Sequence, residues 1–135
     1  MWLPYLTGVR DRLAVLPGVK TCRIGLEVSL SAEDYPMIRL VPARMTRVAS
    51  DRLKRQMELT VYYGAPLVES DESAEAQWDA LFALEALIID ALSFGSGYLV
   101  LFIDTTPGFV TQEQTAHNLH FQVFASRFQI TTHVP

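Results

Sequence analysis

Ser96 is the first candidate nucleophile in this sequence, and its neighbours decide against catalysis. Ser96 lies directly between Gly95 and Gly97, whereas the nucleophile elbow of hydrolases places its glycines two residues away on either side of the serine. The two glycines also lack the third glycine, or the Gly-Lys-Ser/Thr ending, of a phosphate-binding loop. We therefore expect a helix-to-strand turn here, with no catalytic or cofactor-binding role.

The histidines and the single cysteine are candidate metal ligands. His117 and His120 are three residues apart, so on one strand they point to opposite faces. Neither they nor His133 has a cysteine or a pair of acids nearby in the sequence. Cys22 falls on the inward phase of a predicted strand, which favours a buried and unreactive thiol. We expect no metal site and no other cofactor.

Asp104 is the carboxylate best placed for general acid or base chemistry. It follows a predicted buried strand, and burial at a strand end raises the pKa of a carboxyl group toward neutrality. Asp104-Thr-Thr-Pro-Gly108 is also typical of a turn whose aspartate binds its own backbone. The first alternative predicts a small enzyme or ligand-binding domain with a pocket near Asp104, and the second predicts no chemistry.

Charge is segregated along the chain. One segment holds six of the eleven basic residues, with Asp51 as its only acid: Arg39, Arg44, Arg47, Arg52, Lys54 and Arg55. A later segment holds five acids and no base: Glu69, Asp71, Glu72, Glu75 and Asp79. Arginines can bind DNA phosphates, but no aromatic side chains interleave with them and the net charge is −4. We expect contact with a neighbouring subunit's acids, with DNA contact as the alternative.

Composition indicates one globular domain spanning residues 1–135. Half of the residues are apolar and 19% are charged, which excludes intrinsic disorder, and one cysteine excludes a disulfide scaffold. The longest apolar runs are far shorter than the roughly 20 residues of a spanning helix, and no secretory signal is evident. We expect a cytoplasmic protein. So little charge on so small a domain favours oligomerisation.

Hydrophobic periodicity predicts the elements of the N-terminal half. Apolar residues at three- and four-residue spacing predict a helix from Trp2 to Leu16. Alternation predicts strands over Thr21–Leu30, Tyr35–Pro42 and Arg55–Tyr63. The basic segment Ala43–Lys54 is compatible with either a long hairpin arm or a short helix.

The C-terminal half begins with the clearest helix, over Ser73–Leu92, whose apolar residues cover so much of its circumference that we expect packing on two sides. The apolar run Tyr98–Ile103 predicts a strand buried on both faces, and Thr105–Ala116 a long polar loop. In the final strand the apolar phase changes near Ser126, which predicts a bulge or a bend there. One phase holds Leu119, Phe121, Val123 and Ala125, and the other holds Phe128, Ile130, Thr132 and Val134. The expected class is α+β: a mainly antiparallel sheet with an N-terminal helix and one long central helix packed on it.

Several local motifs, in this order, carry a family resemblance. They are Pro36-Met-Ile-Arg-Leu-Val-Pro42, Tyr62-Tyr63-Gly64, a helix led by Trp78 with Leu84-Glu85, and Asp104-Thr-Thr-Pro-Gly108 before a phenylalanine-containing strand. From Thr21 onward the chain resembles the small tail-terminator, or tail-completion, proteins of long-tailed bacteriophages and prophages. It is also similar to the related head-tail joining proteins.

The resemblance implies a structural role in virion assembly, without enzymatic activity or a cofactor. Such a protein forms a homo-oligomeric ring that caps the tail tube and presents a surface to the head connector. The arm at residues 43–54 and the segment 105–116 would be interaction elements. The arginines would line a lumen through which DNA passes, or bridge subunits. The protein would reside in the host cytoplasm during assembly and then in the virion.

Overall fold

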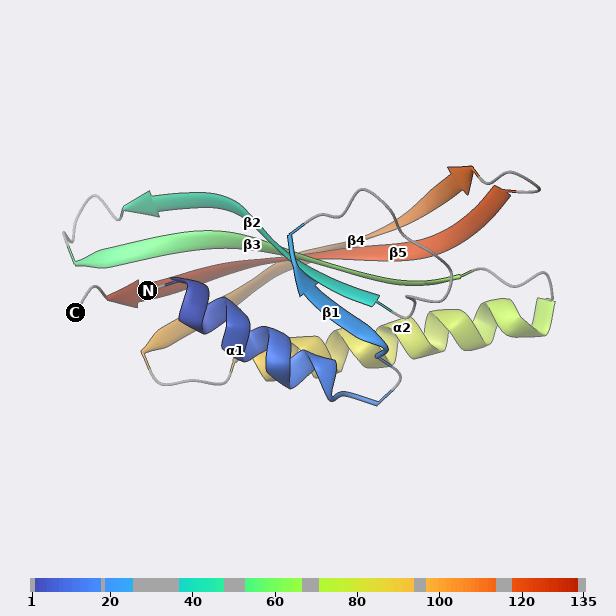
Figure 1. Cartoon of the computed structure of the whole chain (residues 1–135), viewed down its shortest axis with the longest axis horizontal. Helices are drawn as coiled ribbons and strands as arrows, with labels where there is room; N and C mark the ends of the chain where they lie inside the picture. The colour runs from blue at the N-terminus through green and yellow to red at the C-terminus, as the bar shows by residue number, and fades with distance from the viewer. Residues whose placement is uncertain are drawn as a thin grey trace.

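The structure is a computed structural model that describes residues 2–17, 19–25, 37–47, 53–66, 71–93, 97–113 and 118–133. Figure 1 shows a long, strongly twisted sheet with both helices on one side of it. The elements in chain order are α1 (Trp2–Ala14), β1 (Thr21–Ile24), β2 (Met37–Arg47), β3 (Lys54–Pro66), α2 (Asp71–Leu92), β4 (Tyr98–Glu113) and β5 (Asn118–His133).

The described strands form one mixed sheet in the order β1-β2-β3-β5-β4. The short β1 pairs with β2 in parallel, and every other neighbouring pair is antiparallel. The two helices and this sheet confirm the α+β class. In the described part of the chain, neither helix is long and apolar enough to cross a membrane.

The core lies between the helices and one face of the sheet. The helices contribute eight of its buried apolar or aromatic side chains from stripes at three- and four-residue spacing: Tyr5, Leu6, Val9, Leu13, Leu81, Leu84, Ile88 and Leu92. The central strands contribute alternate residues, such as Leu59 and Val61 of β3. The alternate positions on these strands therefore lie on the face away from the helices, which we call the opposite face.

The basic arm is a hairpin within the described residues. Strand β2 continues to Arg47, which is the register partner of Arg55 on β3, so the hairpin alternative is the correct one. Residues 48–52, which include Arg52, lie outside the description. Figure 1 places this end of the hairpin at one end of the long axis and the start of α2 at the other.

Strand β4 differs from two expectations. The segment Tyr98–Ile103 is not buried on both faces, because Leu99 and Leu101 lie on the opposite face, where they are exposed. Among the described strands, β4 is also an edge of the sheet. The predicted loop from Thr105 is wrong as far as Glu113, because β4 continues through it in register with β5. Pro107 is compatible with this position, since edge strands tolerate a missing backbone N–H.

Strand β5 also differs from its predicted pattern. Its pairing with β3 runs without interruption past Ser126, and the register shift lies in β4 instead, between Phe102 and Asp104. Phe124, Ser126 and Phe128 are all buried, so a single phase faces the core. The phase assigned to Val123 and Ala125 from the sequence was therefore the wrong one for this part of the strand.

Candidate functional site

The opposite face of the sheet carries a row of charged side chains from four adjacent strands. Arg127 of β5 binds Asp104 of β4 through two hydrogen bonds, with Nη2–Oδ2 at 2.6 Å and Nε–Oδ1 at 2.8 Å. On its other side, the Nη1 atom of Arg127 lies 3.6 Å from Oε1 of Glu58 on β3. Arg44 of β2 is the register partner of Glu58. The strands thus place charges of alternating sign side by side.

The surroundings of Asp104 argue against the general acid or base alternative. The hydrogen bonds and the charge of Arg127 hold the pKa of the Asp104 carboxyl below its ordinary value. A general base at neutral pH needs a pKa moved in the other direction. Asp104 also does not begin a turn, because β4 continues beyond it. It therefore acts as an ion-pair partner that ties β4 to β5.

A hollow of about 360 Å³ lies beside this charged row. It is lined by Arg44, Thr46, Gln56, Glu58, Ile103 and Gln129. One cation, one carboxylate and several hydroxyl or amide groups could together bind a small polar molecule with both donors and acceptors. The hollow touches the region of the predicted pocket through Ile103, the chain neighbour of Asp104.

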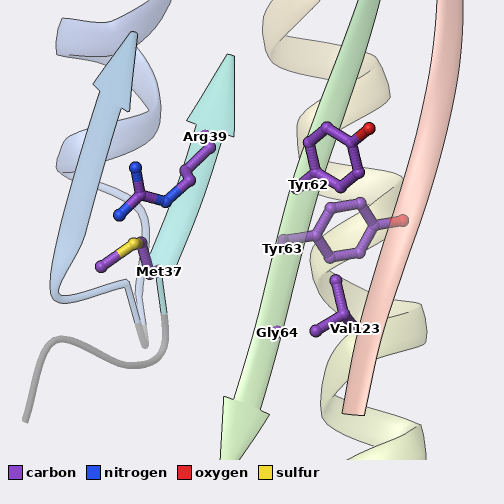
Figure 2. A pocket seen from close by; sticks show the side chains of 6 residues that line it. All are labelled: Met37, Arg39, Tyr62, Tyr63, Gly64 and Val123. Carbon is purple, nitrogen blue, oxygen red and sulfur yellow. The ribbon is translucent and has the colours of Figure 1, made fainter. Parts of the chain in front are cut away.

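A second, much smaller cavity of about 20 Å³ is lined in part by the buried Arg39, and Figure 2 shows all of its lining residues. The side chain of Arg39 extends from β2 toward β1, where its Nη1 donates to the carbonyl oxygen of Gly25 at 3.3 Å. Only 5% of Arg39 is exposed. The cavity has room for about one water molecule, which is too little for a ligand. Arg39 instead supports the junction of β1 and β2 through its hydrogen bond to Gly25.

The six predicted basic residues do not form one surface on a single copy of the chain. Strand alternation places Arg44 on the opposite face, whereas Arg47 and its register partner Arg55 occupy the phase of the core side. Lys54 is the register partner of His133. Arg39 is buried and Arg52 lies outside the described residues. The residues that stay available lie at the hairpin end of the sheet.

The acidic residues lie at the other end of the molecule. Glu75 and Asp79 are exposed on α2, where they line an open hollow of about 680 Å³ with Ala76, Trp78 and Phe82. Trp78 and Phe82 both contact Phe124 of β5, with ring centroids 5.4 and 5.5 Å from it. Asp71 and Glu72 are in the first turn of α2, but their side chains, like Glu69, lie outside the description.

Other candidate residues are placed only in part. Cys22 is buried, and burial raises the pKa of its thiol to about 11, as expected for an unreactive cysteine. Ser96 and His117 lie outside the described residues, as do the side chains of His120 and His133. Among the side chains that are described, no three His, Cys, Asp or Glu residues are grouped as metal ligands would be.

A buried hydroxyl network was not predicted from the sequence. The Ser126 Oγ atom lies 2.8 Å from Tyr63 Oη and 2.7 Å from Thr105 Oγ1, which connects β5 to both neighbouring strands. Tyr63 Oη also donates to Glu85 of α2 at 3.4 Å. These contacts fasten the long helix to the middle of the sheet.

The exposed edge of the sheet is the other feature that sequence reasoning missed. Four apolar side chains near the start of β4 are exposed to a large extent: Leu99 (72%), Leu101 (57%), Phe102 (39%) and Ile103 (42%). Scattered exposed leucines are ordinary, but neighbouring exposed apolar side chains on an edge strand mark an interaction surface.

No protein-family model matches the chain, and no curated protein matches it significantly.

Proposed function

We propose that this protein is a structural subunit of virion assembly, a tail-terminator or tail-completion factor that forms a ring on the tail tube and mediates head-tail joining. The observation that carries the proposal is the apolar row on β4, because such a surface needs a protein partner. The resemblance over most of the chain supplies the identity of the assembly.

The distribution of charge supports self-association. Arg44 and Arg47 are exposed at the hairpin end, while Glu75 and Asp79 are exposed at the opposite end of the long axis. One molecule cannot bring these groups together, whereas two copies in head-to-tail contact can. On this proposal the acids of one subunit receive the arm of another, and non-specific contact of the arm with DNA is the alternative.

The ring is tested by sedimentation and electron microscopy of the purified chain, alone and mixed with tail tubes. We expect species larger than a dimer that cap tube ends and stop further polymerisation. A chain that stays monomeric up to about 200 µM and ignores tail tubes would overturn the proposal.

The arm is tested by replacing Arg44, Arg47 and Arg52 with alanine. We expect weaker ring formation, and a salt dependence that is reduced relative to the unmodified chain. The matched control replaces Arg10 and Arg12, which are basic residues of α1. If the triple variant of the arm and the double variant of α1 assemble equally well, the arm is not a subunit contact.

A second candidate function rests on the hollow beside Glu58 and Arg44. Its volume of about 360 Å³ is within the range of small-molecule sites, and its lining offers both charges. If the protein binds a small ligand, titration with polar metabolites should change the NMR chemical shifts of residues around this hollow and not elsewhere. The substitution Glu58→Gln should reduce these changes. If no metabolite changes the chemical shifts, only the assembly role remains.

A further inference from the structure

The first half of helix α2 carries two aromatic rings that the fold leaves partly exposed. The ring centroids of Trp78 and Phe82 are 5.7 Å apart, and 53% of Phe82 is exposed. Both rings contact the buried Phe124 of β5, which holds them in place without covering them. Helix α1 packs near the other end of α2, where the Tyr5 hydroxyl donates to the carbonyl oxygen of Leu92 (Figure 1). Exposed aromatic side chains of this kind are the ones that protein interfaces favour.

Two carboxylates border the same rings. Glu75 and Asp79 are four residues apart, so they are neighbours on the helix surface, and both are exposed. They line the hollow of about 680 Å³ together with the two rings. In the described part of the chain no ion pair involves either acid, and α2 itself contains no Lys, Arg or His. The hollow thus combines aromatic surface with negative charge that no described ion pair neutralises.

Aromatic rings and carboxylates together favour a cation as the occupant. The face of a ring attracts a cation placed over it, and carboxylates accept the hydrogen bonds of that cation. A guanidinium group suits both, because it is flat, weakly hydrated and carries five N–H donors. An ammonium group is compact and more strongly hydrated, so it gives up more on leaving water. The chemistry of the hollow therefore favours arginine over lysine.

The form of the hollow favours a protein side chain over a small cation. A divalent metal ion needs more ligands than two carboxylates supply. A quaternary ammonium ion is bound best in a cage of aromatic rings, whereas two rings line an open hollow here. Nucleic acid is excluded because its phosphates would meet the two acids. A long side chain that reaches in from a neighbouring protein fits an open hollow of this charge.

We propose that this hollow receives an arginine side chain of a partner protein. We call it the arginine site, and its residues are Glu75, Trp78, Asp79 and Phe82. The guanidinium group lies against the aromatic pair and donates hydrogen bonds to the two carboxylates. The identity of the partner rests on the proposed function, in which Arg44 or Arg47 of a second copy would supply the side chain.

The first test titrates the Trp2→Phe protein, in which Trp78 is the only tryptophan, with the peptide acetyl-Gly-Arg-Gly-amide. We expect a saturable change in Trp78 fluorescence, with dissociation in roughly the millimolar range. The lysine peptide should bind at least about twofold more weakly, and the citrulline peptide, which keeps the shape of arginine without its charge, should not bind. No response would overturn the proposal, as would equally tight binding of the lysine peptide or of tetramethylammonium.

Two substitutions separate the arginine site from general attraction to an acidic helix. Phe82→Leu keeps an apolar side chain against Phe124 but removes one ring, and Asp79→Asn removes one exposed charge. We expect each to weaken binding of the arginine peptide about two- to fivefold. Asp90→Asn is the matched control, since Asp90 is an exposed acid of α2 outside the hollow. Equal weakening by Asp90→Asn and Asp79→Asn, or unchanged binding by Phe82→Leu, would reject the arginine site.

Sedimentation of the same protein distinguishes the arginine site from the proposed ring. The peptide titrations are made at a concentration where the chain sediments as a monomer, so that no neighbouring copy occupies the hollow. A chain that binds the arginine peptide but stays monomeric at about 200 µM keeps the arginine site and rejects the ring. A chain that forms rings but does not bind the peptide as a monomer rejects the arginine site and keeps the ring.

Discussion

Arg127 of β5 and Asp104 of β4 form a two-point ion pair on the face of the sheet opposite the helices, at 2.6 and 2.8 Å. The contact lies directly after the register shift of β4, between Phe102 and Asp104. A register shift interrupts the ladder of backbone hydrogen bonds, and the ion pair ties the strand down again at that point. The ion pair thereby holds β4 on β5 next to the interruption.

Acid should weaken this contact. The pKa of the Asp104 carboxyl is lowered in the folded state, so its contribution to stability is present above the unfolded pKa of about 4 and is lost as pH falls through the folded value. We expect Asp104→Asn to show a smaller loss of stability than the unmodified chain between neutral pH and about pH 3. Urea unfolding at both pH values measures the difference. Equal losses of stability in the variant and in the unmodified chain would show that the ion pair does not contribute.

The buried hydroxyl network should contribute to stability. Tyr63→Phe removes the hydroxyl that contacts both Ser126 and Glu85, and we expect a loss of about 1–2 kcal/mol in the free energy of unfolding. Tyr62→Phe is the matched control, because the adjacent tyrosine is only half-buried and lies on the opposite face. Its effect should stay within about 0.5 kcal/mol. Equal losses in chemical denaturation would contradict a role for the network.

Titration at high pH tests the burial of Tyr63 independently. Burial raises the pKa of Tyr63 to about 12, so the resulting stability is fully present below the unfolded pKa of about 10 and is lost as pH rises toward 12. A spectrophotometric titration of phenolate formation in the folded protein should contain a late step that Tyr63→Phe removes. If that variant instead loses a step near the unfolded pKa, Tyr63 is accessible to solvent.

Local periodicity predicted the elements whose two faces differ. Helix α2 begins and ends within two residues of its predicted bounds, because acids at its start and glycines beyond its end mark the limits. The alternation around Leu59 and Val61 predicted β3 and its inward phase. In these elements each side chain's polarity reflects its own environment.

The misassigned elements are those whose environment depends on strand order. A run such as Leu99-Val-Leu-Phe-Ile103 looks the same whether it lies in the middle of a sheet or at an edge that awaits a partner. Likewise, phenylalanines occur on both phases of β5, so hydrophobicity alone could not select the inward one. The pairing of Asp104 with Arg127, 23 residues apart in the sequence, requires the register of β4 on β5.

Two glycines should respond to alanine with opposite signs. A Cβ atom at Gly64 would lie 2.7 Å from the carbonyl oxygen of Gln122, so the backbones of β3 and β5 would have to move apart. We expect Gly64→Ala to destabilise the fold by about 1–3 kcal/mol. Gly8 lies within α1 with nothing within 4 Å of its added Cβ, and Gly8→Ala should stabilise by about 0.5–1 kcal/mol. Thermal unfolding of both variants measures the signs. Stabilisation by Gly64→Ala would mean that β3 and β5 are not paired in this register.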